Sequence, residues 1–340
     1  MPRFPAKKIC IVRLSALGDI VHTHGLINGL RKGYPDAHLT WILQPVAYDM
    51  VKHQSSIDSF IIFDRKGGIG SWRSLHRRLK NEYFDLVLML QVSIKANMIS
   101  YLVNGDKKLG FDTIRSREMH WLFANRRIPY HAPQHVQDQF FEFLDYLCIE
   151  DYPKDWDFTF SNEELSYKES FFKDLGRPVI SFVIASSNPE KDWQAEKYAE
   201  VINYVENNLN MQPMIIGGPS KGERAITEKI CQYCRTEPVV SLEKPIRKTM
   251  LQLSGSKIVV SPDTGPLHMA VGMGVPTIGL YGFSNPKRCG PYRFHDLLID
   301  KYNDPGQENL AITRKTKKGR MEKISSQEVI DKINLALERY

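Results

Sequence analysis

The apolar residues of this 340-residue chain fall into short runs, and segments with helical spacing separate these runs. Ten of the runs predict strands, at residues 8–13, 38–43, 59–63, 85–90, 107–111, 178–185, 212–216, 238–242, 257–260 and 276–281. Strands that alternate with helices pair in parallel, because each helix carries the chain back across the sheet. The chain is therefore predicted to be an α/β protein.

A polar segment at residues 150–155 interrupts the alternation and divides the chain into two halves. We expect one Rossmann-like domain over residues 1–150 and a second over residues 151–325, followed by a closing helix over residues 326–340. Ser325 or Ser326 is expected to cap this helix ahead of Glu328. In such sheets ligands bind at the carboxyl ends of the strands, so the loops that follow strands are the places to search for sites.

Charge and composition limit the possible partners. The formal net charge is +7, which favours an anionic partner. Basic residues gather in two parts of the first half, from Arg65 to Arg78 and around Arg117. No apolar run approaches the roughly 20 residues that span a bilayer. The first run is broken by Arg13, so it predicts a strand rather than a signal peptide, and we expect a cytoplasmic protein.

The loop after the first predicted strand is the first candidate site. Residues 13–19 have the sequence RLSALGD, and Asp19 falls at the start of a predicted helix. The glycine spacing matches neither a dinucleotide-binding loop nor a P-loop. From its position alone, Asp19 is either a carboxylate that caps the helix or a general base at the floor of the cleft between the domains.

Two further candidate sites follow strands in the second half. Residues 186–193, SSNPEKDW, combine hydroxyl groups with Lys191, which could neutralise charge on a departing phosphate. A polar loop with a surface lysine explains this sequence equally well. Residues 261–268, SPDTGPLH, place a helix N-terminus beside Thr264 and His268, and such a terminus favours phosphate. The alternative is that Asp263 only caps the helix.

Two short patterns bear on metal binding. Asp155-Trp156-Asp157 matches the D-x-D pattern of metal-dependent sugar transferases, but it falls in the polar segment between the halves rather than at a strand end. Cys231 and Cys234 form a single C-x-x-C within a predicted helix, with no second pair to complete a zinc site. We therefore expect no metal and no other cofactor.

Together, the three candidate loops resemble those of the ADP-heptose:lipopolysaccharide heptosyltransferases, glycosyltransferase family 9. The resemblance extends from about residue 8 to residue 291 and is carried by residues 15–19, by Lys191 with Trp193, and by residues 263–265 with His268. The family has the GT-B fold, in which two Rossmann-like domains face each other across a cleft. It transfers L-glycero-D-manno-heptose from ADP-heptose with inversion at the anomeric carbon.

The resemblance implies a role for each matching residue. Asp19 takes the place of the general base. The residues of the donor site would be Ser187, Lys191, Glu223, Asp263, Thr264, Gly265 and His268. In this scheme Lys191 and Ser187 lie near the phosphates, Glu223 lies near the nucleoside, and residues 263–265 hold the sugar and the diphosphate.

Within the family the enzymes that add the first heptose are the most similar, through residues 19–23, 110–112 and 116–118. Basic residues of their N-terminal domain meet the anionic Kdo–lipid A acceptor. That role would fall on Arg65, Arg73, Arg77, Arg78 and Arg117. The resemblance thus implies transfer to the Kdo–lipid A inner core of lipopolysaccharide, with peripheral contact at the cytoplasmic face of the inner membrane and no nucleic-acid partner.

Three alternatives stand beside this prediction. The chain could add the second or a later heptose, which requires an acceptor that already carries heptose. It could be a GT-B sugar-nucleotide epimerase, although an epimerase has no anionic acceptor to hold with the basic first half. It could also be a basic RNA-binding protein, which predicts salt-dependent RNA affinity and no turnover.

Overall fold

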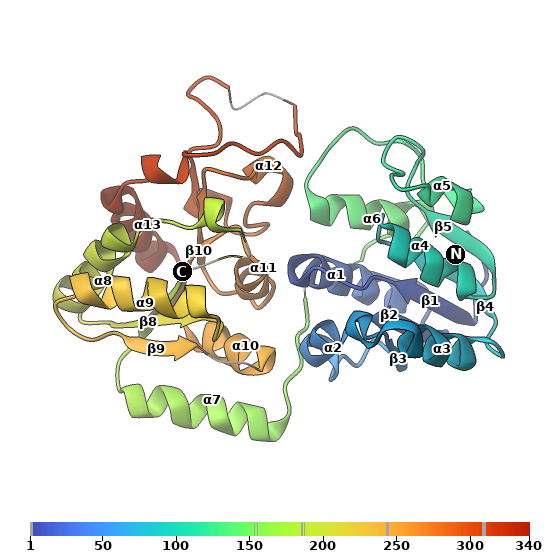
Figure 1. Cartoon of the computed structure of the whole chain (residues 1–340), viewed down its shortest axis with the longest axis horizontal. Helices are drawn as coiled ribbons and strands as arrows, with labels where there is room; N and C mark the ends of the chain where they lie inside the picture. The colour runs from blue at the N-terminus through green and yellow to red at the C-terminus, as the bar shows by residue number, and fades with distance from the viewer. Residues whose placement is uncertain are drawn as a thin grey trace. The chain divides into compact units, whose positions relative to one another are not determined.

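The computed structural model describes residues 3–152, 154, 156–184, 186, 188–242, 245–307 and 311–340. The chain divides into two compact units, Met1–Thr159 and Phe160–Tyr340, and each has a parallel sheet of its own (Figure 1). We call them the N-terminal unit and the C-terminal unit. Among the residues described, no helix has the length and apolar character needed to cross a membrane.

The N-terminal unit is built on a sheet with the strand order β3-β2-β1-β4-β5-β6. Its strands are β1 (Lys8–Val12), β2 (His38–Leu43), β3 (Ser59–Ile62), β4 (Phe84–Met89), β5 (Gly105–Gly110) and β6 (Arg126–Arg127). In the central strand β1, Ile9 is paired with Leu39 of β2 and Leu86 of β4. This strand is an unbroken apolar run because helices cover both faces of the sheet.

The helices of this unit are α1 (Leu17–Gly33), α2 (Pro45–Val51), α3 (Gly68–Leu79), α4 (Ile94–Leu102), α5 (His120–Phe123) and α6 (Val136–Tyr146). Leu75 of α3 and Ile99 of α4 belong to one apolar cluster, and Phe123 of α5 packs against it. These three helices therefore cover the same face of the sheet. On α1, a Cβ at Gly29 would collide with Leu144 of α6, so glycine permits the close packing of these two helices.

The C-terminal unit has a second sheet, with the strand order β12-β11-β10-β7-β8-β9. Its strands are β7 (Val179–Val183), β8 (Gln212–Gly217), β9 (Val239–Leu242), β10 (Ile258–Pro262), β11 (Thr277–Tyr281) and β12 (Leu298–Asp300). Ile180 of β7 is paired with Ile258 of β10 and Pro213 of β8. The loops after β10, β7 and β8 therefore leave the same edge of the sheet, next to one another.

The helices of the C-terminal unit are α7 (Asn162–Leu175), α8 (Ala195–Leu209), α9 (Lys221–Tyr233), α10 (Ile246–Gly255), α11 (Gly265–Gly272), α12 (Pro286–Cys289) and α13 (Ser326–Arg339). The closing helix α13 packs against α8. The Ser325 hydroxyl accepts from the Glu328 N–H at 3.3 Å, and the Ser325 N–H donates to the Glu328 carboxylate at 3.0 Å. Ser325 is thus the cap that the sequence predicts here.

The predicted α/β architecture with two Rossmann-like sheets is confirmed. All ten predicted strands are present, and their ends differ from the prediction by at most two residues. The edge strands β6 and β12 were not predicted, because neither forms an apolar run of ordinary strand length: β6 consists of two exposed arginines and β12 has three residues. The helix α7 was not predicted either, although Tyr167, Phe171 and Leu175 follow the helical i, i+4, i+8 spacing; none of its residues is fully buried.

Candidate active site

In the N-terminal unit the loop after β1 is tied to the end of β4. The backbone N–H groups of Leu14 and Ser15 both donate to Gln91 Oε1, at 2.8 and 3.3 Å. Gln91 lies directly beyond β4, so the two adjacent strands end at one anchored junction. These bonds fix the path of the chain into α1 and hence the direction in which its first turn presents side chains. Gln91 was not predicted from the sequence.

Asp19 lies in the first turn of α1, and its carboxylate points back to the start of the helix. Its Oδ2 atom accepts from the Ala16 N–H at 3.4 Å and forms an ion pair with Arg13. The N-cap residue is Ala16, so the interpretation of Asp19 as the N-cap is wrong. The Asp19 side chain is 31% exposed. A carboxylate that is fixed in place and open to solvent is suited to accept a proton.

Arg13 fixes this carboxylate from a buried position. Its guanidinium donates to the carbonyl oxygen of Leu90 at 2.5 Å and lies 5.4 Å from the centre of the Phe140 ring, while its other terminal nitrogen contacts Asp19. A planar guanidinium can make these contacts at once, whereas an ammonium cannot. In the sequence, Arg13 ends an apolar run and begins the candidate loop at residues 13–19, but no role was predicted for it. A charged side chain directly after a buried strand, close to an aspartate, is the signal that could have found it.

Two of the predicted acceptor residues lie at the same edge of the sheet as Asp19. Arg65 follows β3, and Arg117 follows β5 in a loop whose next residue, Glu118, accepts from the Ile94 N–H at the start of α4. Both arginines are exposed. Since parallel strands end at one edge, the structure places these two cations on the edge that carries the candidate base.

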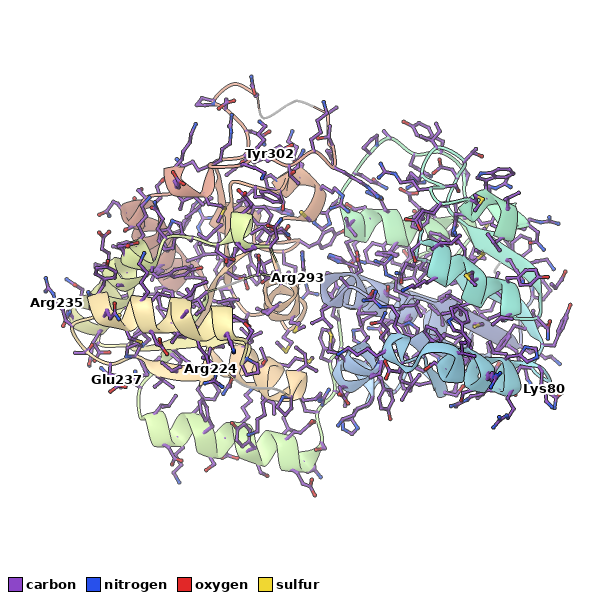
Figure 2. The ribbon with its side chains drawn as sticks, viewed as in Figure 1. Lys80, Arg224, Arg235, Glu237, Arg293 and Tyr302 are labelled. Atoms are coloured by element: carbon purple, nitrogen blue, oxygen red, sulfur yellow. The ribbon has the colours of Figure 1, made fainter. Side chains whose placement is uncertain are left out.

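The other predicted acceptor residues lie along α3. Twelve residues of helix span about 18 Å, and α3 leads away from the edge that carries Asp19. Arg73 lies midway along it. Arg77 and Arg78 lie at its far end, where Arg78 donates to the carbonyl oxygen of Phe60 at 2.9 Å. Figure 2 shows Lys80 just beyond, at the outer end of the helix. All three arginines are exposed, but they do not form one cluster with Arg65.

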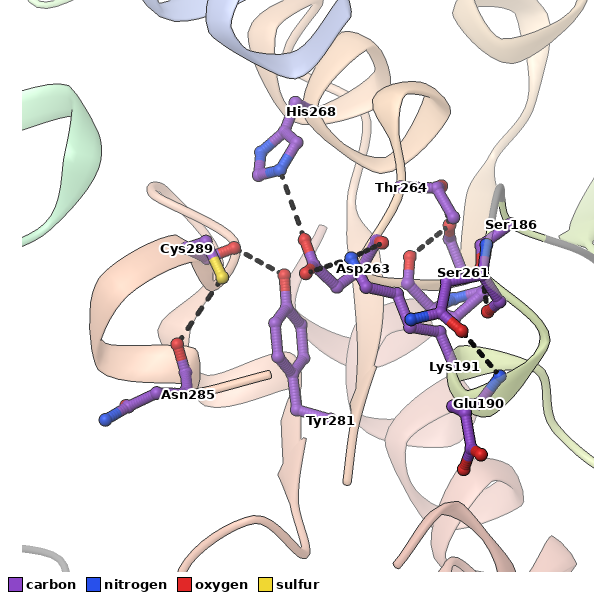
Figure 3. Close-up of polar contacts among 12 residues, drawn as sticks. Ser186, Glu190, Lys191, Ser261, Asp263, Thr264, His268, Tyr281, Asn285 and Cys289 are labelled. Carbon is purple, nitrogen blue, oxygen red and sulfur yellow. Dashed lines mark hydrogen bonds and ion pairs between the residues drawn. The ribbon is translucent and has the colours of Figure 1, made fainter. Parts of the chain in front are cut away.

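In the C-terminal unit three predicted donor residues meet (Figure 3). Lys191 Nζ donates to Asp263 Oδ2 at 2.7 Å and to the Asp263 carbonyl oxygen at 3.0 Å. His268 Nε2 lies 3.5 Å from Asp263 Oδ1. Burial alone would raise the pKa of the Asp263 carboxyl, but the hydrogen bond from His268 and the charge of Lys191 hold that pKa well below its usual range. Asp263 is therefore an anion at neutral pH and orients the lysine.

Thr264 and Gly265 form the start of α11. Thr264 is the N-cap residue, although its hydroxyl lies 3.1 Å from the Ser261 hydroxyl and does not bond to the helix N–H groups. Gly265 is the first helical residue and has no side chain to cover those groups. The first N–H groups of a helix have no partner within it and favour an anion. Lys191 and this helix start are thus the two positive features beside Asp263.

One wall of this site was not predicted from the sequence. Tyr281 at the end of β11 donates from its hydroxyl to the Cys289 carbonyl oxygen at 2.5 Å (Figure 3). The Cys289 thiol lies 3.4 Å from the carbonyl oxygen of Asn285. Burial, with the nearby charge of Asp263, raises the pKa of both the Tyr281 hydroxyl and the Cys289 thiol. Both groups therefore stay neutral and leave the charge of the site to Lys191 and Asp263.

Lys191 is positioned by the loop after β7. The loop ends in a single turn of 3-10 helix, Pro189–Lys191, in which the Asn188 side chain accepts from the Glu190 N–H at 3.1 Å. The next residues enter the core, where the Trp193 indole N–H donates to the Ile324 carbonyl oxygen at 3.1 Å. Ser187, the predicted phosphate ligand in this loop, lies outside the described residues.

Glu223 lies in the first turn of α9, after β8. Its carboxylate accepts from the Gly218 N–H and from the Ser220 hydroxyl, both at 2.6 Å. These bonds hold the glycine-containing turn after β8 in a defined shape. Because β10, β7 and β8 are neighbours, Glu223 shares one edge of the sheet with Lys191 and Asp263. The structure therefore brings the described donor-site predictions to a single edge.

Within the described parts of the chain, no group of three or more His, Cys, Asp or Glu side chains is placed to hold a metal ion. Asp155 of the D-x-D pattern lies outside those parts. Cys231 and Cys234, at the end of α9, carry free thiols.

Comparison with known proteins gives the family. A family model described as glycosyltransferase family 9 (heptosyltransferase) matches residues 72–318. The lipopolysaccharide core heptosyltransferase OpsX of Haemophilus influenzae is 33% identical over 314 residues, which cover 92% of this chain and 90% of that protein. The chain belongs to glycosyltransferase family 9.

Other members support the same assignment. Lipopolysaccharide heptosyltransferase 1 of Salmonella typhimurium is 26% identical over 301 residues, which cover 84% of this chain and 91% of that protein. The solved structure of a family 9 glycosyl transferase from Veillonella parvula has a TM-score of 0.86 at 22% identity and covers 98% of both chains. The predictions of the GT-B fold and of a glycosyltransferase are confirmed. Membership in family 9 decides against the epimerase and the RNA-binding alternatives.

Proposed function

We propose that this family 9 enzyme transfers L-glycero-D-manno-heptose from ADP-heptose to the Kdo–lipid A inner core of lipopolysaccharide, with inversion at the anomeric carbon. The observation that carries the proposal is the pair of anchored carboxylates. Asp19 is held by Arg13 and open to solvent, and Asp263 is buried and orients Lys191. The first could serve an acceptor hydroxyl and the second a donor diphosphate. The names of the relatives support lipopolysaccharide as the acceptor class.

In the proposed reaction the N-terminal unit holds the acceptor. Asp19 takes the proton of the acceptor hydroxyl as the oxygen of that hydroxyl attacks the anomeric carbon of the heptose. The bond from this carbon to the diphosphate oxygen breaks, and a single displacement inverts the configuration. Arg65 and Arg117, at the same edge as Asp19, bind the acidic groups of the acceptor. Arg73, Arg77 and Arg78 extend the basic surface along α3, toward the membrane that carries the acceptor.

The C-terminal unit holds the donor in this scheme. Lys191 and the N–H groups at the start of α11 stabilise the charge that grows on the departing ADP. Asp263 keeps the lysine ammonium in place, and His268 keeps Asp263 in place. Glu223 and Ser187 complete the contacts of the nucleotide. No metal ion takes part, and the enzyme works at the cytoplasmic face of the inner membrane.

The alternative is a second or later heptose transfer. The test uses purified protein, ADP-heptose and two acceptors, O-deacylated Kdo–lipid A and the same acceptor with one heptose attached, with products followed by mass spectrometry. We expect one heptose to be added to the first acceptor and none to the second. Addition only to the second acceptor moves the enzyme to a later step. Failure on both, with ADP-heptose still bound, refutes the acceptor class.

A further inference from the structure

A group of large apolar side chains lies exposed on the N-terminal unit. It comes from α4, α5 and the residue before α5, and its members are 39 to 71% exposed. We call it the α4–α5 patch; it consists of Ile94, Met98, Tyr101, Met119, Trp121 and Leu122. Single exposed apolar residues are ordinary on protein surfaces, but a contiguous group of this kind marks an interaction surface.

The patch has a regular basis in α4. Ile94, Met98 and Tyr101 follow the i, i+4, i+7 spacing, so they lie on one face of the helix. The opposite face, with Ala96 and Ile99, is buried in the core against the sheet. The helix α4 is therefore apolar toward the core and apolar again toward the outside. A helix on the surface of a domain is normally polar on its outer face.

Defined contacts join α4 to α5, so the patch is one continuous surface. Asn97 Nδ2 donates to the Glu118 carbonyl oxygen at 2.8 Å, and Asn97 Oδ1 lies 2.7 Å from His120 Nδ1. The rings of Tyr101 and Phe123 meet edge to face, with centroids 6.3 Å apart. Burial, with the nearby charge of Arg127, lowers the pKa of His120 to about 4, so His120 adds no charge to this junction at neutral pH. The acidic side chain at the junction is Glu118, which accepts from the Ile94 N–H.

Basic residues surround the patch. Lys95, Arg126 and Arg127 are exposed, and Arg127 donates to the Trp121 carbonyl oxygen at 2.8 Å. The same face of the sheet carries α3, and between Asp64 and Lys80 the chain has six basic residues and one acidic residue. A surface with exposed tryptophan, tyrosine and aliphatic side chains beside many cations matches the interface of an anionic bilayer, where the rings lie at headgroup level.

We propose that the α4–α5 patch is the surface through which the enzyme docks on a lipid bilayer with anionic headgroups. The six apolar side chains enter the interfacial layer, while Lys95, Arg126, Arg127 and the basic residues of α3 contact lipid phosphates. The inference deepens the proposed function. It rests on that function in one respect: an acceptor carried by a lipid requires the enzyme to reach a bilayer. Docking itself is measurable without any acceptor.

The test is vesicle flotation with the full chain and no acceptor. Vesicles of phosphatidylcholine mixed with phosphatidylglycerol are compared with vesicles of phosphatidylcholine alone. We expect the wild type to bind the anionic vesicles, less so as salt is raised. The double variant Met98→Asp, Leu122→Asp should bind them at least about tenfold more weakly. The matched control Leu165→Asp, Val240→Asp replaces two exposed apolar residues of the C-terminal unit and should bind as the wild type does.

Tryptophan emission provides a second readout. Trp41, Trp156 and Trp193 are buried and Trp72 is half-buried, which leaves Trp121 as the exposed one of the five tryptophans. Anionic vesicles should shift the emission to shorter wavelength, and Trp121→Phe should abolish the shift while leaving flotation largely intact. An unchanged emission spectrum in the presence of bound vesicles would place another surface against the lipid and overturn the proposal.

The remaining outcomes are distinct. Equal flotation of the double variant and the wild type overturns docking through the patch. Sedimentation that shows a dimer for the wild type and a monomer for the double variant, without vesicle binding, assigns the patch to a second copy of this chain instead.

Transfer to the water-soluble, O-deacylated acceptor should be unchanged in the double variant, and its loss in a folded variant would overturn the proposal. Vesicle binding without any heptose transfer by the wild type refutes the proposed function alone.

Discussion

Asp19 and Asp263 occupy similar places in their units, and their surroundings differ. Each follows a central strand and lies beside the start of a helix, and each has a cationic partner. Asp19 contacts Arg13, which is itself held by a backbone carbonyl and an aromatic ring, and 31% of the Asp19 side chain is exposed. Asp263 has both Lys191 and His268 against it and is 13% exposed.

From this comparison we propose opposite roles for carboxylates at the same location in a parallel sheet. One fixed partner orients a carboxylate and leaves an oxygen accessible to a reactant. Two partners and burial turn the carboxylate into an internal counter-ion whose task is to hold a lysine. The first arrangement should matter for chemistry more than for stability, and the second for both. Each prediction below tests one side of this contrast.

The largest effect is expected for Asp19→Asn. The amide keeps the size of the side chain but cannot take a proton, so kcat should fall by about a thousandfold or more. The affinity for ADP-heptose and the melting temperature should stay close to those of the wild type, because the change lies in the N-terminal unit and the side chain is partly exposed. Steady-state kinetics with calorimetric titration of the donor measure both. A kcat within tenfold of the wild type would remove Asp19 from the role of base.

The next effect in size is expected for Lys191→Met, which keeps the side-chain stem and removes the charge. The buried Asp263 carboxylate then loses its lysine partner and keeps His268, and breaking a buried ion pair costs about 3 kcal/mol. Donor affinity should fall together with the free energy of unfolding, unlike in the Asp19 variant. The matched control is Lys229→Met, whose partner Glu196 is exposed, and it should change neither quantity. A destabilised Lys191 variant with unchanged donor affinity would leave this lysine a structural role alone.

A smaller effect is expected for Arg13→Lys. An ammonium cannot bridge the Leu90 carbonyl and the Asp19 carboxylate while stacking on a ring, so the base loses its fixed orientation. We expect kcat to fall about tenfold with little change in KM for either substrate. The control Arg31→Lys alters a guanidinium of the same unit that pairs with Asp58 at 2.6 Å, away from the candidate site. If both variants lose the same activity, the loss reflects general destabilisation rather than orientation of Asp19.

The local sequence was sufficient for ten of the strands and for placing three charged residues in loops that follow strands, since both depend on short segments. Buried strands are recognised as apolar runs, and Asp19, Lys191 and Asp263 stand out because they lie in the polar segments that follow such runs. Two of the residues that were missed, Gln91 and Tyr281, act between segments that are apart in the sequence. Gln91 supports a loop 77 residues earlier in the chain, and Tyr281 closes a site whose charge lies on other segments. Pairing of this kind is set by strand order, which no local pattern contains.

The positions of the predicted acceptor arginines also show that local sequence does not determine which residues lie together. In the sequence, Arg65, Arg77 and Arg78 form one basic cluster. In the structure a helix about 18 Å long separates the first from the other two. Only Arg65 shares the edge of Asp19, together with the distant Arg117. These arginines are close in the sequence but far apart in the structure, because the residues of a helix are spread along its axis.

The smallest effect is expected in the acid response of the Asp263 site. The pKa of Asp263 is depressed in the folded protein, so its charge adds stability that is complete above the ordinary aspartate pKa of about 3.9 and is lost as the pH falls below it. In Asp263→Asn this contribution is absent at every pH. Between pH 6 and pH 3 the wild type should therefore lose about 1 kcal/mol more of its unfolding free energy than this variant, by urea denaturation. Equal acid losses in the wild type and Asp263→Asn would mean that Asp263 is not the buried counter-ion of Lys191, and the contrast between the two sites would fail.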